Sequence, residues 1–113
     1  MPESSERGAL TEAVYYILLA LHTTMHGYGI MQFVKEKSNE RVSLGPGTLY
    51  GAINTMLGKG WIKALTSEGD SRKKEYEITE IGRNVVEEEI KRLEELIING
   101  KRIIRGEGIW NHQ

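Results

Sequence analysis

The 113-residue sequence contains no cysteine. Without a thiol, the chain has no disulfide, no thiolate zinc site and no cysteine nucleophile, and it suits a reducing compartment. A long apolar run is missing too, because the longest, residues 13–21, is too short to span a bilayer, and residues 1–8 lack the apolar core of a signal peptide. We therefore expect a cytoplasmic protein with no membrane partner.

Positive charge is also scarce for a nucleic-acid binder. The formal net charge is −1, which taken alone argues against such a partner. The distribution matters more: residues 26–79 hold eight basic and six acidic side chains, whereas residues 80–99 hold three basic and six acidic ones. Because phosphate binding needs a local patch and not a basic protein, the segment 26–79 is compatible with an anionic partner.

Catalytic patterns are missing as well. No serine–histidine–aspartate set and no glycine-rich phosphate loop is visible, and we expect the three glutamates at 87–89 to be solvated. His22 and His26 have the spacing of helical metal ligands, but no carboxylate motif accompanies them, and Gly27 indicates that the helix has ended. The sequence therefore predicts neither an enzyme nor a metal site nor a bound cofactor.

Apolar periodicity predicts three helices in the first 60 residues. The first, Leu10 to His22, is apolar on two sides, so in a chain this small its second side is expected to face another subunit. After a turn with two glycines, the second runs roughly from Gly29 to Ser38. The third begins at Pro46, which suits a first helical turn, and ends at the glycine-rich residues 58–60.

A hairpin and a long helix follow. Two strands, 61–66 and 72–79, are joined by residues typical of a turn, and Thr79 is expected to cap the next helix. Residues 80–99 carry apolar side chains at four-three-four spacing, typical of a two-helix contact, and Gly100 is expected to interrupt the helix.

The order of these elements predicts a mainly α fold with a small β-hairpin wing, that is, a winged helix-turn-helix followed by a C-terminal dimerisation helix. We assign residues 8–79 to the DNA-binding domain, 80–100 to the dimerisation helix and 101–113 to a tail that is either disordered or a short helical turn.

Four motifs, together with this order, resemble the PadR family of transcriptional regulators. They are HGYGI at 26–30, GPGTLY at 45–50, GKGWI at 58–62 and RKKEYEITEIG at 72–82. The chain is similar to the smaller branch of that family, which has a single C-terminal helix. The resemblance implies a homodimer that binds a pseudo-palindromic DNA operator, usually as a repressor, and in some relatives a small aromatic effector bound at the dimer interface.

Candidate DNA contacts come first from the third helix. A helix enters a major groove about 12 Å wide only if its approaching face is not bulky, and small or polar groups stand opposite the apolar face here: Thr48, Tyr50, Gly51, Asn54 and Thr55. Tyr50 could donate to phosphate, and Asn54 could bind adenine bidentately. The alternative is an ordinary surface with Tyr50 half-buried; the resemblance favours DNA, because Thr48 and Tyr50 match the family's DNA-facing positions.

Further candidates lie on either side of that helix. Arg72, Lys73 and Lys74 could bind phosphate or enter a narrow minor groove, although strand alternation turns Lys73 away from the other two. At the start of the second helix, Tyr28 could offer a hydroxyl and Gly29 free backbone donors. The alternatives are a solvated hairpin and glycines that only shape a turn.

Candidate dimer contacts lie on the first and last helices, at Tyr15, Tyr16, Leu19, Val86, Ile90, Leu93 and Ile97. Two other functions stay open on sequence alone. One is a protein that senses or sequesters small molecules in its dimer cleft, and the other is a winged-helix module that binds protein.

Overall fold

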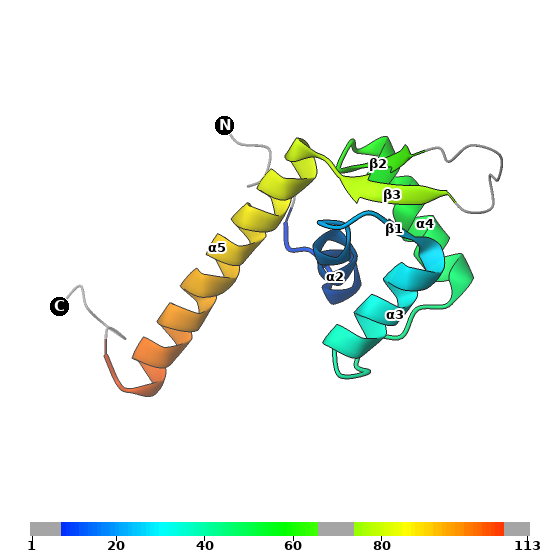
Figure 1. The fold of residues 1–113 in the computed structure, drawn as a ribbon. Helices are drawn as coiled ribbons and strands as arrows, with labels where there is room; N and C mark the ends of the chain where they lie inside the picture. The colour runs from blue at the N-terminus through cyan, green and yellow to red at the C-terminus, as the bar shows by residue number, and fades with distance from the viewer. Residues whose placement is uncertain (1–7, 66–73, 108–113) are drawn as a thin grey trace.

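The structure, a computed structural model, describes residues 8–65 and 74–107. A body of short helices and a small sheet carries one long helix that projects from it (Figure 1). In chain order the elements are α2 (Glu12–Ala20), β1 (Met25–His26), α3 (Gly27–Lys37), α4 (Pro46–Gly58), β2 (Ile62–Leu65), β3 (Glu75–Ile78) and α5 (Glu80–Ile104). The predicted mainly α fold with a small β wing is confirmed.

Side-chain caps set where these helices begin. The Thr11 hydroxyl accepts a hydrogen bond from the Val14 backbone N–H at 3.1 Å, which fixes the start of α2. The predicted Thr79 cap of α5 is confirmed, since its hydroxyl accepts from the Gly82 N–H at 3.1 Å. His26 caps α3 in the same way, so this helix begins at Gly27, two residues earlier than the glycine pattern predicted.

The core lies where α2, α3, α4, the sheet and the first turns of α5 meet. Its fully buried side chains are aliphatic or methionine residues spaced three or four apart in each helix, as the sequence predicted. The largest are Ile17, Leu18, Leu21, Ile30, Val34, Leu49, Ile53 and Met56. This core fixes α3 and α4 relative to one another and leaves their outer faces exposed.

The sheet has three antiparallel strands in the order β1-β3-β2, one more than the predicted hairpin. Met25 pairs with Tyr76, and Ile62 pairs with Ile78. The strand β1 was missed because two residues are too few to show an alternating pattern. The outer ends of the two predicted strands, at Thr66 and from Arg72 to Lys73, lie outside the described residues.

The long helix α5 runs to Ile104, so the prediction that Gly100 interrupts it is wrong. One glycine costs a helix interior about 1 kcal/mol, which is too little to stop the propagation of a helix of 25 residues. The described helices include none that is long and apolar enough to cross a bilayer.

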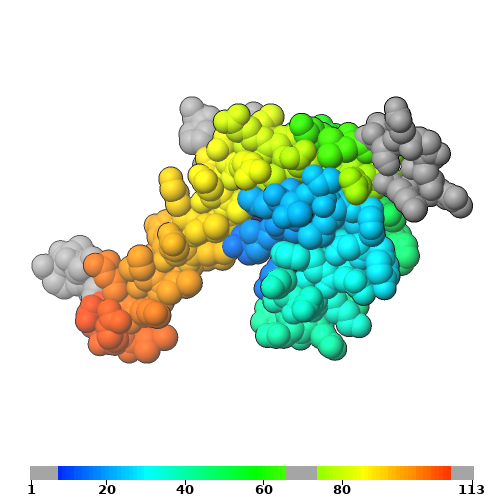
Figure 2. Space-filling model, viewed as in Figure 1, coloured from blue at the N-terminus to red at the C-terminus, as the bar shows by residue number. Residues whose placement is uncertain are grey.

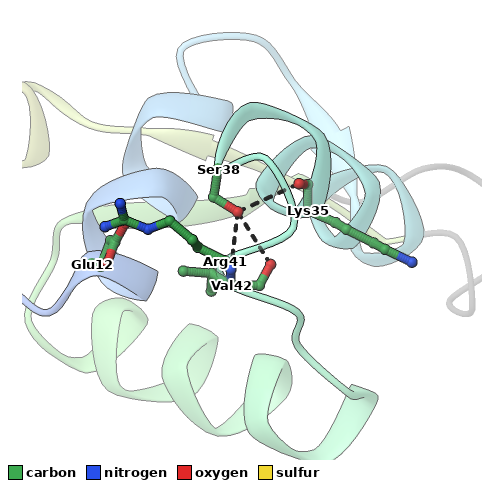
Figure 3. Close-up of polar contacts among 5 residues, drawn as sticks. All are labelled: Glu12, Lys35, Ser38, Arg41 and Val42. Atoms are coloured by element: carbon green, nitrogen blue, oxygen red, sulfur yellow. Dashed lines mark hydrogen bonds and ion pairs between the residues drawn. The ribbon is translucent and has the colours of Figure 1, made fainter.

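A tight turn between α3 and α4 sets their angle (Figure 3). The Ser38 hydroxyl, which is buried, accepts from the Val42 N–H at 3.0 Å and donates toward the carbonyl oxygens of Lys35 and Val42, each 3.4 Å away. Arg41 reaches back to α2, where its guanidinium pairs with the Glu12 carboxylate at 2.7 Å. These contacts tie the turn to α3 and to α2, and so place the segment that leads into α4.

Candidate nucleic-acid interface

The outer face of α4 is flat and open. Leu49, Ile53 and Met56 bury the inner face of the helix, and Leu57 is half-buried. The opposite side exposes small or polar residues, namely Gly47, Thr48, Gly51, Asn54, Thr55 and Gly58. A Cβ placed on any of these three glycines would meet no atom within 4 Å, so nothing in the described part of the chain covers this face.

Two side chains on this face differ in how many of their polar groups remain available to a binding partner. Thr55 donates its hydroxyl proton to the Gly51 carbonyl at 3.2 Å, which leaves the lone pairs of its oxygen available. Asn54 is exposed and stands beside it, and its amide makes no hydrogen bond to residues 8–65 and 74–107. Such an amide next to small neighbours can reach the base edges of a groove without obstruction.

Tyr50 lies at the edge of the α4 face and not in its middle. Its side chain is 41% exposed, and its hydroxyl packs over Gly27, where a Cβ would overlap the hydroxyl oxygen. Burial, and secondarily the nearby Tyr50, raises the pKa of Tyr76 on β3. Tyr50 therefore bridges α4, the start of α3 and the sheet, and Gly27 is required for that close approach.

The start of α3 offers a hydroxyl but not the free backbone donor that was predicted. Tyr28 is 63% exposed, and its oxygen accepts from the Gln32 side-chain amide at 3.0 Å. The Gly29 N–H donates to Nδ1 of His26 at 3.4 Å, so the expectation of a free donor there is wrong. His26, which sequence analysis considered as a metal ligand, is the N-cap of α3 and accepts the hydrogen bond from this N–H.

The cationic edge of the wing is described only in part. Lys74 is exposed just before β3, whereas Arg72 and Lys73 lie outside the described residues. On the neighbouring strand β2, Lys63 is exposed and pairs in register with Glu77. In Figure 1, α3, α4 and this edge of the sheet lie on the side of the body away from the free end of α5.

The predicted dimer residues divide into two groups. Val86 is buried in the protomer's own core, so it is not available to a partner, and its assignment to a dimer contact is wrong. Ile97 is exposed, Ile90 stands at the edge of exposure and Leu93 is half-buried. On α2, the half-buried residues are Tyr15, Tyr16 and Leu19.

Glu89 departs from the prediction that residues 87–89 are solvated, because it is only 2% exposed. Its carboxylate accepts from Arg92 at 2.6 Å and 3.1 Å, and from the Leu10 backbone N–H at 3.4 Å. A buried carboxylate needs such donors. The arginine three residues later on the same helical face was the signal that sequence analysis missed.

The part of the chain that the structure describes does not bring together the ligands of a metal site. Residues 8–65 and 74–107 contain no group of three histidine, aspartate or glutamate side chains placed to hold a metal ion. His22 instead directs Nδ1 to the Leu18 carbonyl at 3.0 Å.

Comparison with known proteins gives consistent matches. The model of the transcriptional regulator PadR-like family matches residues 17–88. A PadR family transcription regulator from Clostridium difficile R20291 is 26% identical, with a TM-score of 0.60 over 81% of this chain and 95% of that chain. Bacillus subtilis PadR, solved in complex with operator DNA, is 24% identical, with a TM-score of 0.58 over 66% of this chain and 44% of its own, a likeness of fold.

A curated relative matches a shorter segment. An uncharacterized 37.1 kDa protein in transposon TN4556 of Streptomyces fradiae is 35% identical over 65 residues, which are 58% of this chain. The match covers 18% of that protein.

Proposed function

The chain belongs to the PadR-like family of transcriptional regulators, and from this premise we propose that it binds a pseudo-palindromic DNA operator sequence-specifically, as a homodimer and a repressor, in the cytoplasm. Its family is one of regulators and not of enzymes. The prediction that the chain is not an enzyme agrees with this.

The observation that carries the proposal is the open outer face of α4. A helix approaches the base edges of a groove closely only when the face that enters the groove carries no bulky side chains. Thr48, Asn54 and Thr55 supply polar groups there, and the intervening glycines supply clearance. Among the relatives, Bacillus subtilis PadR was solved with operator DNA, which supports the same use of this fold here.

Phosphate contacts would flank that face on both sides. Tyr28 and Tyr50 place hydroxyl groups beside the start of α3, and Lys74 lies just before β3, preceded in the sequence by Arg72 and Lys73. Such contacts supply affinity and register, whereas base contacts supply sequence preference. A net charge of −1 does not oppose this arrangement, because the acidic excess lies on residues 80–99.

A homodimer would present two α4 helices. Exposed apolar residues on α5 and half-buried Tyr15, Tyr16 and Leu19 on α2 support this assembly. A two-fold axis would set the two recognition helices about 34–36 Å apart, one turn of DNA, and so account for a pseudo-palindrome.

A small aromatic effector completes the proposal. The rings of Tyr15 and Tyr16 lie edge to face with centroids 5.9 Å apart, with Tyr15 near Glu89 of α5, and such rings can stack a flat compound. The compound must bind one dimer arrangement better than another to release DNA. Titrating phenolic acids onto the protein–DNA complex tests this: release supports an effector, whereas binding without release favours the sensing or sequestering alternative.

Fluorescence anisotropy tests the main proposal. Protein is titrated onto DNA from upstream of its own gene and onto shuffled DNA, across a salt series. Asn54→Ala should lose about 1–3 kcal/mol on the preferred DNA alone. Lys74→Ala should weaken both DNAs and reduce the salt slope by about one.

Lys91→Ala, which removes an exposed cation on α5, is the matched control and should change neither quantity. Binding that is insensitive to salt, or equal losses in all three variants, would contradict the proposal and favour a protein-binding module.

A further inference from the structure

The open face of α4 has a midline of glycine with polar side chains on both edges. A helix turns about 100° per residue, so three glycines lie within about 40° of one another, namely Gly47, Gly51 and Gly58. Thr48 and Thr55 stand on one edge of this midline, and Asn54 stands on the other. Figure 2 shows the projecting end of α5, in orange, standing clear of α3, in cyan, so the long helix does not cover this end of the body. The side chains on the two edges are therefore the first that the walls of a groove would meet.

The Thr55 hydroxyl has a fixed polarity. A threonine hydroxyl carries one proton and two lone pairs, and in general it rotates to donate or to accept as its partner requires. Here the proton goes to the Gly51 carbonyl, one turn earlier in α4, with an oxygen-to-oxygen distance of 3.2 Å. Inside a helix, threonine commonly makes this bond to the carbonyl four residues earlier. The exposed side chain therefore presents an oxygen that can only accept a hydrogen bond.

Thr48, on the same edge of the face, provides a contrast. It lies in the first turn of α4, and the residue four positions earlier, Leu44, precedes the helix. Its hydroxyl has no hydrogen-bond partner in residues 8–65 and 74–107, so it can either donate or accept. Two exposed threonines seven residues apart thus differ in the groups that they can bind.

The major groove distinguishes bases by the same property. Adenine and cytosine present an amino group there, whereas guanine and thymine present a carbonyl oxygen. An oxygen that only accepts can bind the amino group. Against a carbonyl oxygen two acceptors would face each other, and relief would require breaking the hydrogen bond between Thr55 and Gly51. Since every base pair has one amino base and one carbonyl base in this groove, such an oxygen detects the orientation of the pair.

We propose that Thr55 is a specificity-determining residue that selects an amino base, adenine or cytosine, over a carbonyl base, guanine or thymine, at one position of each half-site. The inference rests on the operator binding proposed above and assigns a class of base to one contact. Asn54 lies about 100° away around the helix, across the glycine midline, so the two side chains contact different bases. With two hydrogen bonds Asn54 can single out adenine, whereas Thr55 accepts adenine and cytosine alike.

Selection from random DNA tests this assignment. The wild type is incubated with duplexes randomised over about 20 base pairs, the span of two half-sites one turn apart, and the bound DNA is amplified and sequenced. One position in each half-site should hold adenine or cytosine, with guanine and thymine depleted about fivefold or more. Thr55→Val keeps the shape of the side chain but has no hydroxyl, so it should lose this preference at that position, which identifies the base that Thr55 contacts.

Three control variants separate the hydroxyl from its place on the helix and from the fold. Thr55→Ser keeps a hydroxyl that can donate to the same carbonyl, so it should keep the preference. Thr48→Val should not change the preference at that position, because Thr48 lies about 10 Å from Thr55 along the helix axis. Thr23→Val, at an exposed site outside α4, should leave the whole selected sequence unchanged. Circular dichroism should show all the variants to be equally helical.

Bases without an amino group test the contact itself. In the selected sequence, nebularine replaces adenine, or zebularine replaces cytosine, at the position that Thr55 contacts, and both analogues lack the amino group of the natural base. In fluorescence anisotropy the wild type should bind the substituted DNA about fivefold more weakly. Thr55→Val should bind the natural and the substituted DNA equally. Equal losses in the two proteins would show that the amino group acts through another residue, and would overturn the proposal.

The outcomes separate this inference from the proposed function. If the wild type selects a sequence in which no position prefers amino bases, or if Thr55→Val selects the same sequence as the wild type, the role of Thr55 is overturned and sequence-specific binding stands. If the wild type selects no sequence at all, sequence-specific binding and the role of Thr55 are overturned together.

Discussion

Replacing Gly82 with alanine should destabilise this protein, although alanine normally favours a helix. Gly82 lies in the first turn of α5, against the backbone that leads into β2. A Cβ there would overlap the Trp61 carbonyl oxygen and come within 2.7 Å of Cγ1 of Ile78. The first obstacle is backbone, so the helix itself must move.

The magnitude follows from opposing terms. Alanine contributes about 1 kcal/mol of helix propensity, and overpacking costs about 2 kcal/mol. Moving α5 away would also break two hydrogen bonds to the Trp61 carbonyl, from the Thr79 N–H at 2.9 Å and from the Thr79 hydroxyl at 3.0 Å, at about 1 kcal/mol each. We expect a net loss of about 3 kcal/mol, or about 12 °C in Tm for a chain of this size.

Urea denaturation followed by circular dichroism measures this loss at one protein concentration, because the proposed dimer would contribute to apparent stability. Gly51→Ala is the matched control: it is also inside a helix, but its Cβ would meet nothing within 4 Å. That variant should gain about 1 kcal/mol. A Gly82→Ala protein as stable as the wild type, or equal shifts in both variants, would refute the close contact between α5 and the strand.

Three further outcomes are expected. Thr79→Ala should cost about 2 kcal/mol in urea denaturation, because it removes the α5 cap and both hydroxyl contacts to backbone carbonyls; an unchanged midpoint would refute the capping role. Burial raises the pKa of Tyr15 and of Tyr76 above the ordinary 10.0, with further contributions to Tyr15 from neighbouring Tyr16 and Glu89. The folded protein therefore holds these protons more tightly than the unfolded chain, so this stability is complete below pH 10.0 and is lost as pH rises through the folded pKa. Tyr15→Phe should consequently lose less stability than the wild type between pH 9 and pH 11, as urea midpoints would reveal, and parallel losses would count against a buried phenol. Ile90→Lys should convert the proposed dimer to monomer and abolish specific DNA binding, whereas Asn99→Lys, nine residues later and therefore on the opposite side of α5, should not; sedimentation showing an intact Ile90→Lys dimer would contradict the assignment.

Sequence patterns predicted the helices well because their signals are local. Pro46 and the glycines after α4 mark its ends, and Thr79 marks the start of α5. Apolar residues spaced three and four apart indicated each of the helices that build the core. Such signals need only neighbours within one or two turns, so a single sequence is enough to detect them.

The errors concern features that depend on distant parts of the chain. β1 exists because β3 offers it backbone partners, and its two residues carry no pattern of their own. Val86 has the spacing of a dimer contact, but α5 packs against its own body over that turn. Glu89 looks like its two neighbours in sequence and is buried only because Arg92 and the Leu10 backbone supply donors.

The candidate interface shows the same division. Residue type and helical spacing were enough to place Thr48, Asn54 and Thr55 on one open face. They could not show that Tyr50 spans to Gly27, since that contact joins two helices whose angle is set by the Ser38 turn. A glycine kept for clearance and a glycine kept for a turn look alike in sequence until the neighbouring element is known.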